Sequence, residues 1–363
     1  MPPWPPRLLG RARFRRVSRV ISRRASLGLV AGALGLAAFP RSARAADELR
    51  LGTLAPRDSV WGKTLAAWAA SVAQETGGQL KISLYFAGSQ GDEPELVTKV
   101  RDRTLDGAAL TGTGLSAFSP DVAALELPGL VSGYSRLDRA RNALRARAAE
   151  GFDKAGVRLL AEGDTGAMRL FSREAEVVSP RDLGKMQAFV RSGDLVGRAY
   201  VEGATTRPPT LATTEVLGAL LPRSATGPFP DGGARPAHVN VVFASSLAVT
   251  ELKWADLLEY VTPSPVAYGI GGIVVSSGRF DSLAPEARAI VRRTAEATGS
   301  LLTQRVRAAD DAAYARLRAE KKVVTLTDEA RAEWADVCEK LKARMKKLVT
   351  HPDVVDAVAL AGA

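Results

Sequence analysis

The sequence predicts an α/β fold of roughly two domains. Three observations predict it. The length of 363 residues is about twice a typical domain of roughly 150 residues. Hydrophobic residues make up 46% of the chain and charged residues 25%, which is the usage of a globular protein with a sizeable core. Apolar stretches of strand length also alternate with amphipathic stretches of helix length, and this pattern is typical of a parallel or mixed sheet covered by helices.

The first half of the folded part alternates regularly. The helix expected over residues 60–76 carries Leu65, Trp68 and Val72 on one face and ends at a glycine pair, and the helix expected over 94–103 has Pro94 in its first turn. A third helix is expected over 137–155. Apolar runs predict strands over 49–54, 80–86, 107–111, 157–162 and 168–172.

The second half begins with another α/β unit over 182–221, with a candidate strand at 186–190. Seven proline and glycine residues crowd positions 222–237, which predicts an inserted loop. A strand at 239–243, a helix at 246–258 and a strand at 270–275 follow. From Pro285 apolar residues recur every three to four positions, which predicts a helix to about Lys321, far longer than the average of about twelve residues. Thr327 is expected to cap a last helix that ends in the basic run 344–347.

Residues 1–45 have the pattern of a cleaved export signal. They hold ten arginines and no acidic residue, and the uncharged run 27–39 is too short to span a bilayer. Small residues at Ala43 and Ala45 predict cleavage before Ala46, and Arg23-Arg24 resembles a twin-arginine signal. The remaining residues carry 40 basic side chains against 39 acidic, so the net charge of +11 does not predict a nucleic-acid partner. We therefore expect a soluble, exported mature protein.

Residues that commonly carry catalysis are sparse. The two histidines, His238 and His351, have no motif around them, and we expect both to be surface residues. Cys338, the single cysteine, lies within the last predicted helix and is expected to be a buried structural thiol, which leaves no internal disulfide. No two cysteines or histidines have metal-ligand spacing. The glycine patterns 112–114 and 269–272 lack the dinucleotide fingerprint and are expected in turns or strands. We expect no enzyme, cofactor or metal.

Several short motifs occur in the order found in one family. They cover residues 48 to about 330, and together they resemble the solute-binding receptors of tripartite ATP-independent periplasmic (TRAP) transporters, the DctP-like family. That resemblance implies a periplasmic-binding-protein-like fold, in which two α/β lobes close on a solute in a central cleft and a long helix bridges them. The motifs are Gly52-Thr-Leu-Ala-Pro56, Thr76-Gly-Gly78, the GSQGDE stretch at 88–93, Leu105-Asp-Gly-Ala108, Leu127-Pro128, Asp182-Leu183 and Phe280-Asp-Ser-Leu283.

The resemblance also predicts a division of the chain. Lobe 1 is expected to comprise residues 46–166 and about 262–284, and lobe 2 residues 167–261, including the inserted loop 222–237. The bridging helix is expected over 285–321, with a C-terminal helix and tail over 322–363. The chain would cross between the lobes near Gly166 and again at 258–262, and each lobe would hold a sheet of its own.

Two arginines typical of the family are replaced in this sequence. Met168 stands where the first would hold a substrate carboxylate, and Arg169, one residue along a strand, is expected to point to the opposite face. Phe189 stands where the second would be. Arg191 has the same parity as Phe189 but lies two residues further along. The asparagine-bearing region is replaced by residues 240–246.

These replacements predict a small ligand that is apolar or amphipathic rather than a simple dicarboxylate, because an arginine offers paired donors to a carboxylate and an aromatic ring offers none. Core packing is the alternative role for each aromatic residue. The candidate ligand-binding residues are Trp61, Arg169, Phe189, Asn240, Phe243, Ser245 and Tyr268.

Two functions fit the sequence. In the first, the protein is a periplasmic receptor that delivers a small solute to TRAP permease subunits in the membrane or to a periplasmic helper protein. In the second, it is a scaffold or sensor that descends from this family and no longer takes part in transport.

Overall fold

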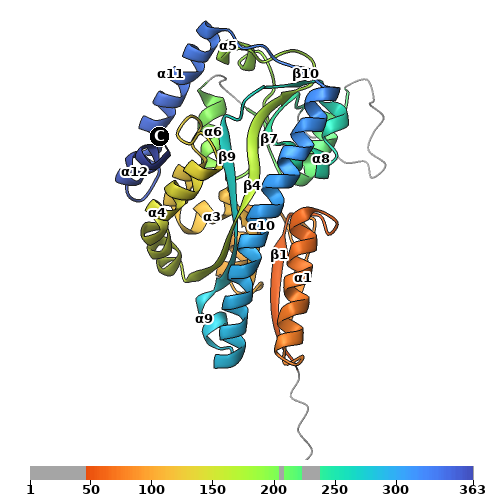
Figure 1. The fold of residues 1–363 in the computed structure, drawn as a ribbon, viewed down its shortest axis with the longest axis vertical. Helices are drawn as coiled ribbons and strands as arrows, with labels where there is room; N and C mark the ends of the chain where they lie inside the picture. Colours follow the sequence, from red (N-terminus) through yellow and green to blue (C-terminus); the bar gives the residue numbers. More distant parts are fainter. Residues whose placement is uncertain (1–45, 204–207, 223–237, 363) are drawn as a thin grey trace, which may run out of the picture. The chain divides into compact units, whose positions relative to one another are not determined.

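A mixed sheet of eight strands forms the centre of the fold (Figure 1). The computed structural model describes residues 46–203, 208–222 and 238–362. The strand order is β10-β8-β4-β9-β3-β1-β2, and β7 also pairs with β4. Strands β5 (Val190–Arg191) and β6 (Thr210–Leu211) form a small second sheet. The central strands are β1 (Asp47–Thr53), β2 (Leu80–Tyr85), β3 (Gly107–Thr111), β4 (Val157–Ser172), β7 (Val241–Ser245), β8 (Tyr260–Val261), β9 (Ala267–Ser276) and β10 (Lys322–Val323).

The two longest strands, β4 and β9, run through the centre of the sheet. The strands predicted at 157–162 and 168–172 are one strand, β4, which pairs with β9 along its length. The register of this pair shifts between Asp164 and Gly166, where Gly166 has a φ of 114°. Because β4 and β9 continue from one half to the other, the expectation of a separate sheet in each lobe is wrong. The residue division between the lobes stays a prediction.

The helices confirm most of the predicted pattern. Ser59 caps α1 by accepting a hydrogen bond from the Gly62 N–H, and Thr327 caps α11 in the same way. The α-helices are α1 (Val60–Glu75), α2 (Glu93–Arg101), α3 (Gly112–Phe118), α4 (Tyr134–Lys154), α5 (Pro180–Leu183), α6 (Leu195–Glu202), α7 (Val216–Leu220), α8 (Ser246–Glu251), α9 (Ser277–Asp281), α10 (Pro285–Glu320), α11 (Asp328–Met345) and α12 (Asp353–Gly362). Short 3-10 helices cover Pro120–Glu126 (η1), Thr213–Glu215 (η2) and Ala255–Leu257 (η3).

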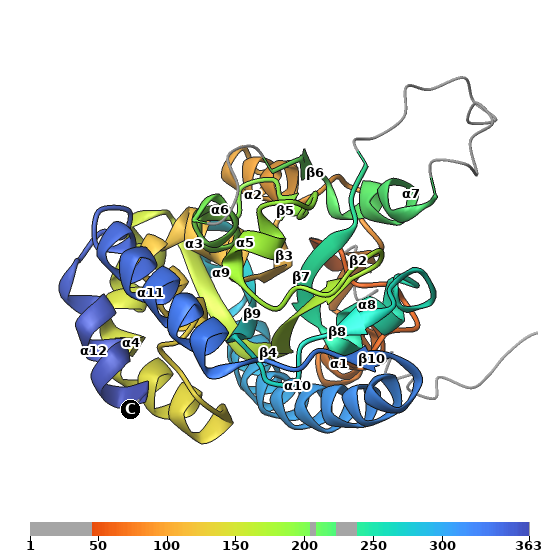
Figure 2. The same cartoon turned by 90° about the horizontal axis from the view of Figure 1, so that it is seen from above.

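Helix α10 is 36 residues long and bridges two separate parts of the core. Val291 and Ala295, in its first half, belong to the cluster that α1, β1 and β2 form, whereas Leu317, near its end, packs with β7 and α8 residues. Figures 1 and 2 show the helix running alongside β4 over this distance. The predicted bridging helix is confirmed.

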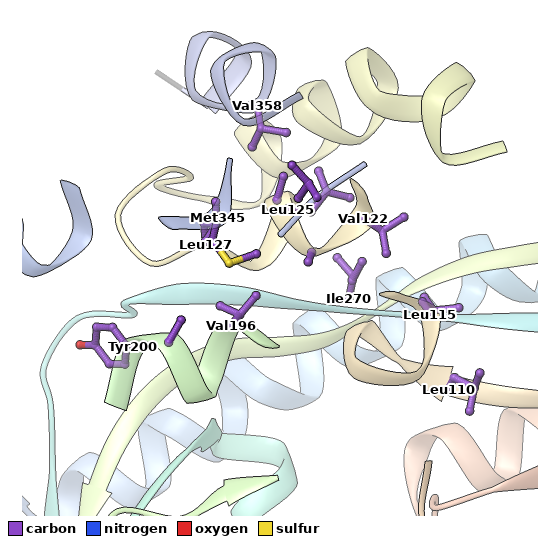
Figure 3. Packing of buried hydrophobic residues seen from close by; sticks show 14 of the residues in the cluster. Leu110, Leu115, Val122, Leu125, Leu127, Val196, Tyr200, Ile270, Met345 and Val358 are labelled. Carbon is purple, nitrogen blue, oxygen red and sulfur yellow. The ribbon is translucent and has the colours of Figure 1, made fainter. Parts of the chain in front are cut away.

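The sheet separates the two larger clusters. On β3, Ala108 and Leu110 face one cluster and Ala109 faces the other, because successive side chains of a strand point to opposite faces. The C-terminal helices complete the first cluster: Figure 3 shows Met345 and Val358 close to the apolar side chains of η1 and the loop after it. Helix α12 also contacts α4, so the segment expected as a tail holds a packed helix.

Other differences from the prediction are local. The helix expected over 246–258 ends at Glu251, where Lys253 takes a positive φ of 63° and η3 follows. The candidate strand at 186–190 is mostly irregular, and the regular strand β5 begins only at Val190. Residues 112–114 begin α3 rather than a turn or a strand. The predicted loop lies, apart from Pro222, outside the described residues, as does the predicted export signal. No helix in the described part of the chain is long and apolar enough to cross a membrane.

Candidate functional site

A cavity of about 150 Å³ is lined by residues within 53–126 on one side and within 165–252 on the other. One wall comes from β1, the loop after it, α1, α2, β3 and η1. The other wall comes from β4, β5, α6, β7 and α8. The middle of both walls is largely apolar, formed by residues that include Leu54, Trp61, Ala109, Met168, Phe189, Phe243 and Leu247.

Four of the seven candidate residues line this cavity: Trp61, Phe189, Phe243 and Ser245. The Trp61 indole is fixed because its Nε1 donates to the Asp164 carbonyl at 3.0 Å. Phe189 contributes to the core as well, since its ring meets Trp254 edge to face at a centroid distance of 6.2 Å. Phe189 therefore both lines the cavity and packs in the core, and its role in ligand binding stays a prediction.

Arg169 does not line the cavity, and its inclusion among the cavity residues is corrected. Its neighbour Met168 does line it, which is the alternation that a strand imposes. The Arg169 guanidinium lies over the Tyr314 ring at 3.6 Å, and Nη1 donates to the Ala167 carbonyl at 3.2 Å. The side chain is buried against α10 and connects β4 to the bridging helix.

Asn240 and Tyr268 also lie outside the cavity lining, contrary to expectation. The Asn240 amide donates to Glu174 Oε2 at 2.9 Å and accepts from the Gln187 N–H at 2.8 Å, so its polar groups already have partners. Tyr268 packs edge to face against Tyr134, with ring centroids 4.9 Å apart. Both residues have structural contacts.

Arg191 is the one basic side chain among the described residues that line the cavity. Its Nη1 reaches across to β3 and α3, donating to Thr111 Oγ1 at 2.8 Å and to Thr113 Oγ1 at 3.4 Å. Its Nε is buried and has no hydrogen-bond partner in the described part of the chain. Parity with Phe189 was the sequence signal for this position.

Three carboxyl groups, those of Glu93, Glu126 and Asp194, line the same cavity, and sequence reasoning missed all three as site residues. The charge of Arg191 acts on Glu93 and on Glu126. Glu93 is held firmly: it accepts from the Thr111 N–H at 2.6 Å, from Thr111 Oγ1 at 2.8 Å and from the Gly114 N–H at 2.8 Å. Asp194 caps α6 by accepting from the Gly197 N–H at 2.8 Å. Burial raises the pKa of Glu93, although Arg191 and the hydrogen bonds from Thr111 oppose the shift.

Glu126, the third carboxyl, is held less completely. Its Oε1 accepts from the Ile270 N–H at 2.7 Å, the one hydrogen bond recorded for this side chain among the described residues. Burial raises the pKa of Glu126 to about 8, and the nearby Asp194 and Glu93 act in the same direction. Glu126 is therefore mostly protonated at pH 7. It directly precedes the Leu127-Pro128 motif, but nothing in that motif suggests a cavity residue.

Hydrogen bonds between protein groups cross the cavity and hold its walls together. Asp92 Oδ2, at the start of α2, accepts from the Thr213 N–H at 2.8 Å. Glu251 Oε1, at the end of α8, accepts from the Val60 N–H of α1 at 2.7 Å, and burial raises the pKa of Glu251. With the contacts of Arg191, these bonds connect the two walls of the cavity.

The strand β4 is held beside the cavity by two buried carboxylates. Asp164 accepts from Arg141 Nη2 at 2.5 Å and from Arg307 Nε at 2.6 Å, which links α4, β4 and α10. Asp310 of α10 accepts from the N–H groups of Ala167 and Leu247 at 2.9 and 2.8 Å. Charge-assisted bonds of this kind are strong, and they fix the segment around Gly166 against the bridging helix.

The remaining reactive residues have structural surroundings. Burial raises the pKa of the Cys338 thiol to about 11, which makes a nucleophilic thiolate unfavourable. His351 is half-buried, with Nδ1 2.6 Å from Asp121 Oδ2, so it is not the isolated surface residue that was expected. His238 lies 3.3 Å from Glu174 and is also largely covered. Within the described residues no group of three or more metal-binding side chains is found.

Comparison with known proteins gives a consistent family. The profile of DctP, bacterial extracellular solute-binding protein family 7, matches residues 51–227 and 245–348. The 2,3-diketo-L-gulonate-binding periplasmic protein YiaO of Escherichia coli strain K12 is 24% identical over 272 residues, which covers 73% of this chain and 77% of YiaO.

Solved structures share the fold. The sugar acid binding protein DctPAm from Advenella mimigardefordensis, in complex with galactonate, superposes with a TM-score of 0.76 at 17% identity and covers 87% of this chain and 98% of its own. A TRAP periplasmic solute-binding protein from Ralstonia eutropha H16, with bound 2-acetolactate, has the same TM-score and coverage at 21% identity.

Proposed function

This chain belongs to the DctP family of bacterial extracellular solute-binding proteins, and on that premise we propose that it is the periplasmic receptor of a TRAP-type transporter for a small amphipathic solute. The solute carries at most one carboxylate and is not a simple dicarboxylate. The receptor has no catalytic role. It reaches the periplasm through a signal cleaved before Ala46, and it delivers its solute to the TRAP permease subunits or to a periplasmic helper protein.

The charge of the cavity is the observation that carries this proposal. Met168 and Phe189, which replace two arginines typical of the family, both line the cavity and offer no donor to a carboxylate. Arg191 provides one guanidinium, and the carboxyl groups of Glu93 and Asp194 line the same cavity. A second carboxylate on the solute would be buried without a cationic partner, which costs several kcal/mol.

Solved structures with this fold include complexes with both monocarboxylates and a dicarboxylate. Galactonate, pyroglutamic acid and L-gulonate, bound to three of the solved structures, each carry one carboxylate. Two other structures hold succinate, a dicarboxylate. The apolar side chains around Phe189 and Phe243 favour a solute with a hydrocarbon part, because each buried Å² of apolar surface contributes about 25 cal/mol.

Calorimetry on purified protein tests the proposal with succinate and 4-methylpentanoate as probes. We expect 4-methylpentanoate to bind more tightly than succinate. We expect Arg191→Gln to weaken its binding by about 10- to 100-fold, the usual effect of losing a charge-assisted hydrogen bond. Phe189→Ala should weaken it by about 5-fold or more through lost apolar contact.

Arg198→Gln is the matched control, because Arg198 lies on α6 outside the cavity lining and donates to Thr210. Its binding should equal that of the unaltered protein. Tighter binding of succinate, or unchanged binding of 4-methylpentanoate in Arg191→Gln, would contradict the proposal.

A further inference from the structure

The side chains that line the cavity include more carboxyl groups than basic groups, and Arg191 is the one basic side chain among the described lining residues. Three carboxyl groups, those of Glu93, Glu126 and Asp194, line the cavity together with this one guanidinium. A fourth, that of Glu251, also lines the cavity. A site that only holds a carboxylate would be expected to carry surplus positive charge, and this one does not.

Two of the carboxyls already have their partners inside the protein. Glu93 accepts three hydrogen bonds, and Thr111 Oγ1 joins it to Arg191 by donating to Glu93 and accepting from Arg191 Nη1. Asp194 is held at the start of α6, where the partial positive charge of the helix end favours a carboxylate. Both carboxyl groups are therefore held by donors of the protein itself and need no partner from the solute.

Glu126 has neither the three donors of Glu93 nor the helix N-terminus beside Asp194. Its Oε1 has one donor, the Ile270 N–H of β9, and the carboxyl lies against Gly112, where a Cβ would come within 2.1 Å of Oε2. The absence of a side chain at position 112 therefore makes room for this carboxyl. The titratable groups whose charge acts on Glu126 are Asp194, Arg191 and Glu93, two carboxyl groups and one guanidinium.

We propose that the solute is a small zwitterion, with a protonated amine that pairs with Glu126 and an acidic group that binds Arg191. This inference rests on the proposed function and adds the second charge of the solute. The amine supplies the cation that the cluster lacks, and the hydrocarbon part of the solute lies against Trp61 and Phe243 on the cavity walls.

Binding of a zwitterion is expected to release a proton from Glu126. Glu126 is mostly protonated in the empty cavity at pH 7, and a neighbouring ammonium group favours the ionised carboxylate. A zwitterion therefore releases close to one proton as it binds. A solute with a carboxylate alone adds negative charge, which favours the protonated form of Glu126 and gives no release.

The test uses calorimetry with leucine and its deaminated analogue 4-methylpentanoate, at pH 7 in buffers of different ionisation enthalpy. We expect leucine to bind at least 10-fold more tightly and to release close to one proton, and 4-methylpentanoate to release none. Glu126→Gln should weaken leucine binding about 10-fold and abolish the proton release. Glu202→Gln, a change on α6 outside the cavity lining, is the control and should change neither.

Equal or tighter binding of 4-methylpentanoate, or proton uptake with leucine, overturns the inference. Failure of both probes to bind at millimolar concentration overturns it as well. If Arg191→Gln weakens both probes but the amine makes no difference, the zwitterion inference fails while the proposed function stands. If Arg191→Gln affects neither probe, the proposed function itself fails.

Discussion

Replacing Glu126 with glutamine is expected to change how the stability of the protein depends on pH. Glutamine keeps the shape of the protonated acid and can still accept from the Ile270 N–H, but it does not ionise. Burial raises the pKa of Glu126 from 4.5 to about 8. In the unfolded chain the carboxyl is exposed and ionises near its ordinary value.

The sign follows from proton binding. Between pH 4.5 and 8 the folded state holds a proton at Glu126 that the unfolded state has lost, so the stability of the unaltered protein falls as pH rises through this range. Each pKa unit is worth about 1.36 kcal/mol, which gives a loss of roughly 3 kcal/mol by pH 7 and roughly 4 kcal/mol by pH 8. These values are upper limits, because the side chain is partly open to the cavity.

Urea denaturation of both proteins at pH 5 and pH 8 measures this effect as a difference in the free energy of unfolding. Other titrating groups cancel when the two proteins are compared at the same pH. We expect Glu126→Gln to gain at least 2 kcal/mol relative to the unaltered protein between the two pH values. Glu320→Gln, at an exposed residue at the end of α10, is the control and should show no such gain. A constant difference between the proteins across this range would refute the reasoning about Glu126.

Two further predictions concern strand β4 and the N-terminus. Gly166→Ala should lower the free energy of unfolding by about 2–4 kcal/mol, because the new Cβ would lie 2.6 Å from Ser245 Cβ at a residue with a φ of 114°. Gly77→Ala, at an open position with a φ of 57°, should cost only about 1 kcal/mol, so equal losses in urea denaturation would contradict the steric argument. N-terminal sequencing of the mature protein should begin at or within a few residues of Ala46, and a mature chain that retains Arg23 and Arg24 would exclude the predicted cleavage.

The sequence pattern predicted the orientation of some site residues but not of others. Strand alternation placed Met168 and Arg169 on opposite faces, and the structure has Met168 at the cavity and Arg169 against Tyr314. Asn240 and Tyr268 were misjudged because the sequence does not show that Gln187, Glu174 and Tyr134 already contact them. A polar or aromatic residue is available to a solute only if the protein leaves it without other partners.

The sequence by itself determined the features that depend on neighbouring residues. The strand at 107–111, the start of α1 after Ser59, the cap at Thr327 and the apolar stripe of α10 follow from periodicity and capping, which act within a few residues. Only the tertiary structure decided which charges share the cavity. Glu126 and Arg191 lie on segments far apart in the chain, and the tertiary fold brings them to one cavity. Burial then raises the pKa of Glu126 to about 8, a property that depends on the groups around it in space rather than along the chain.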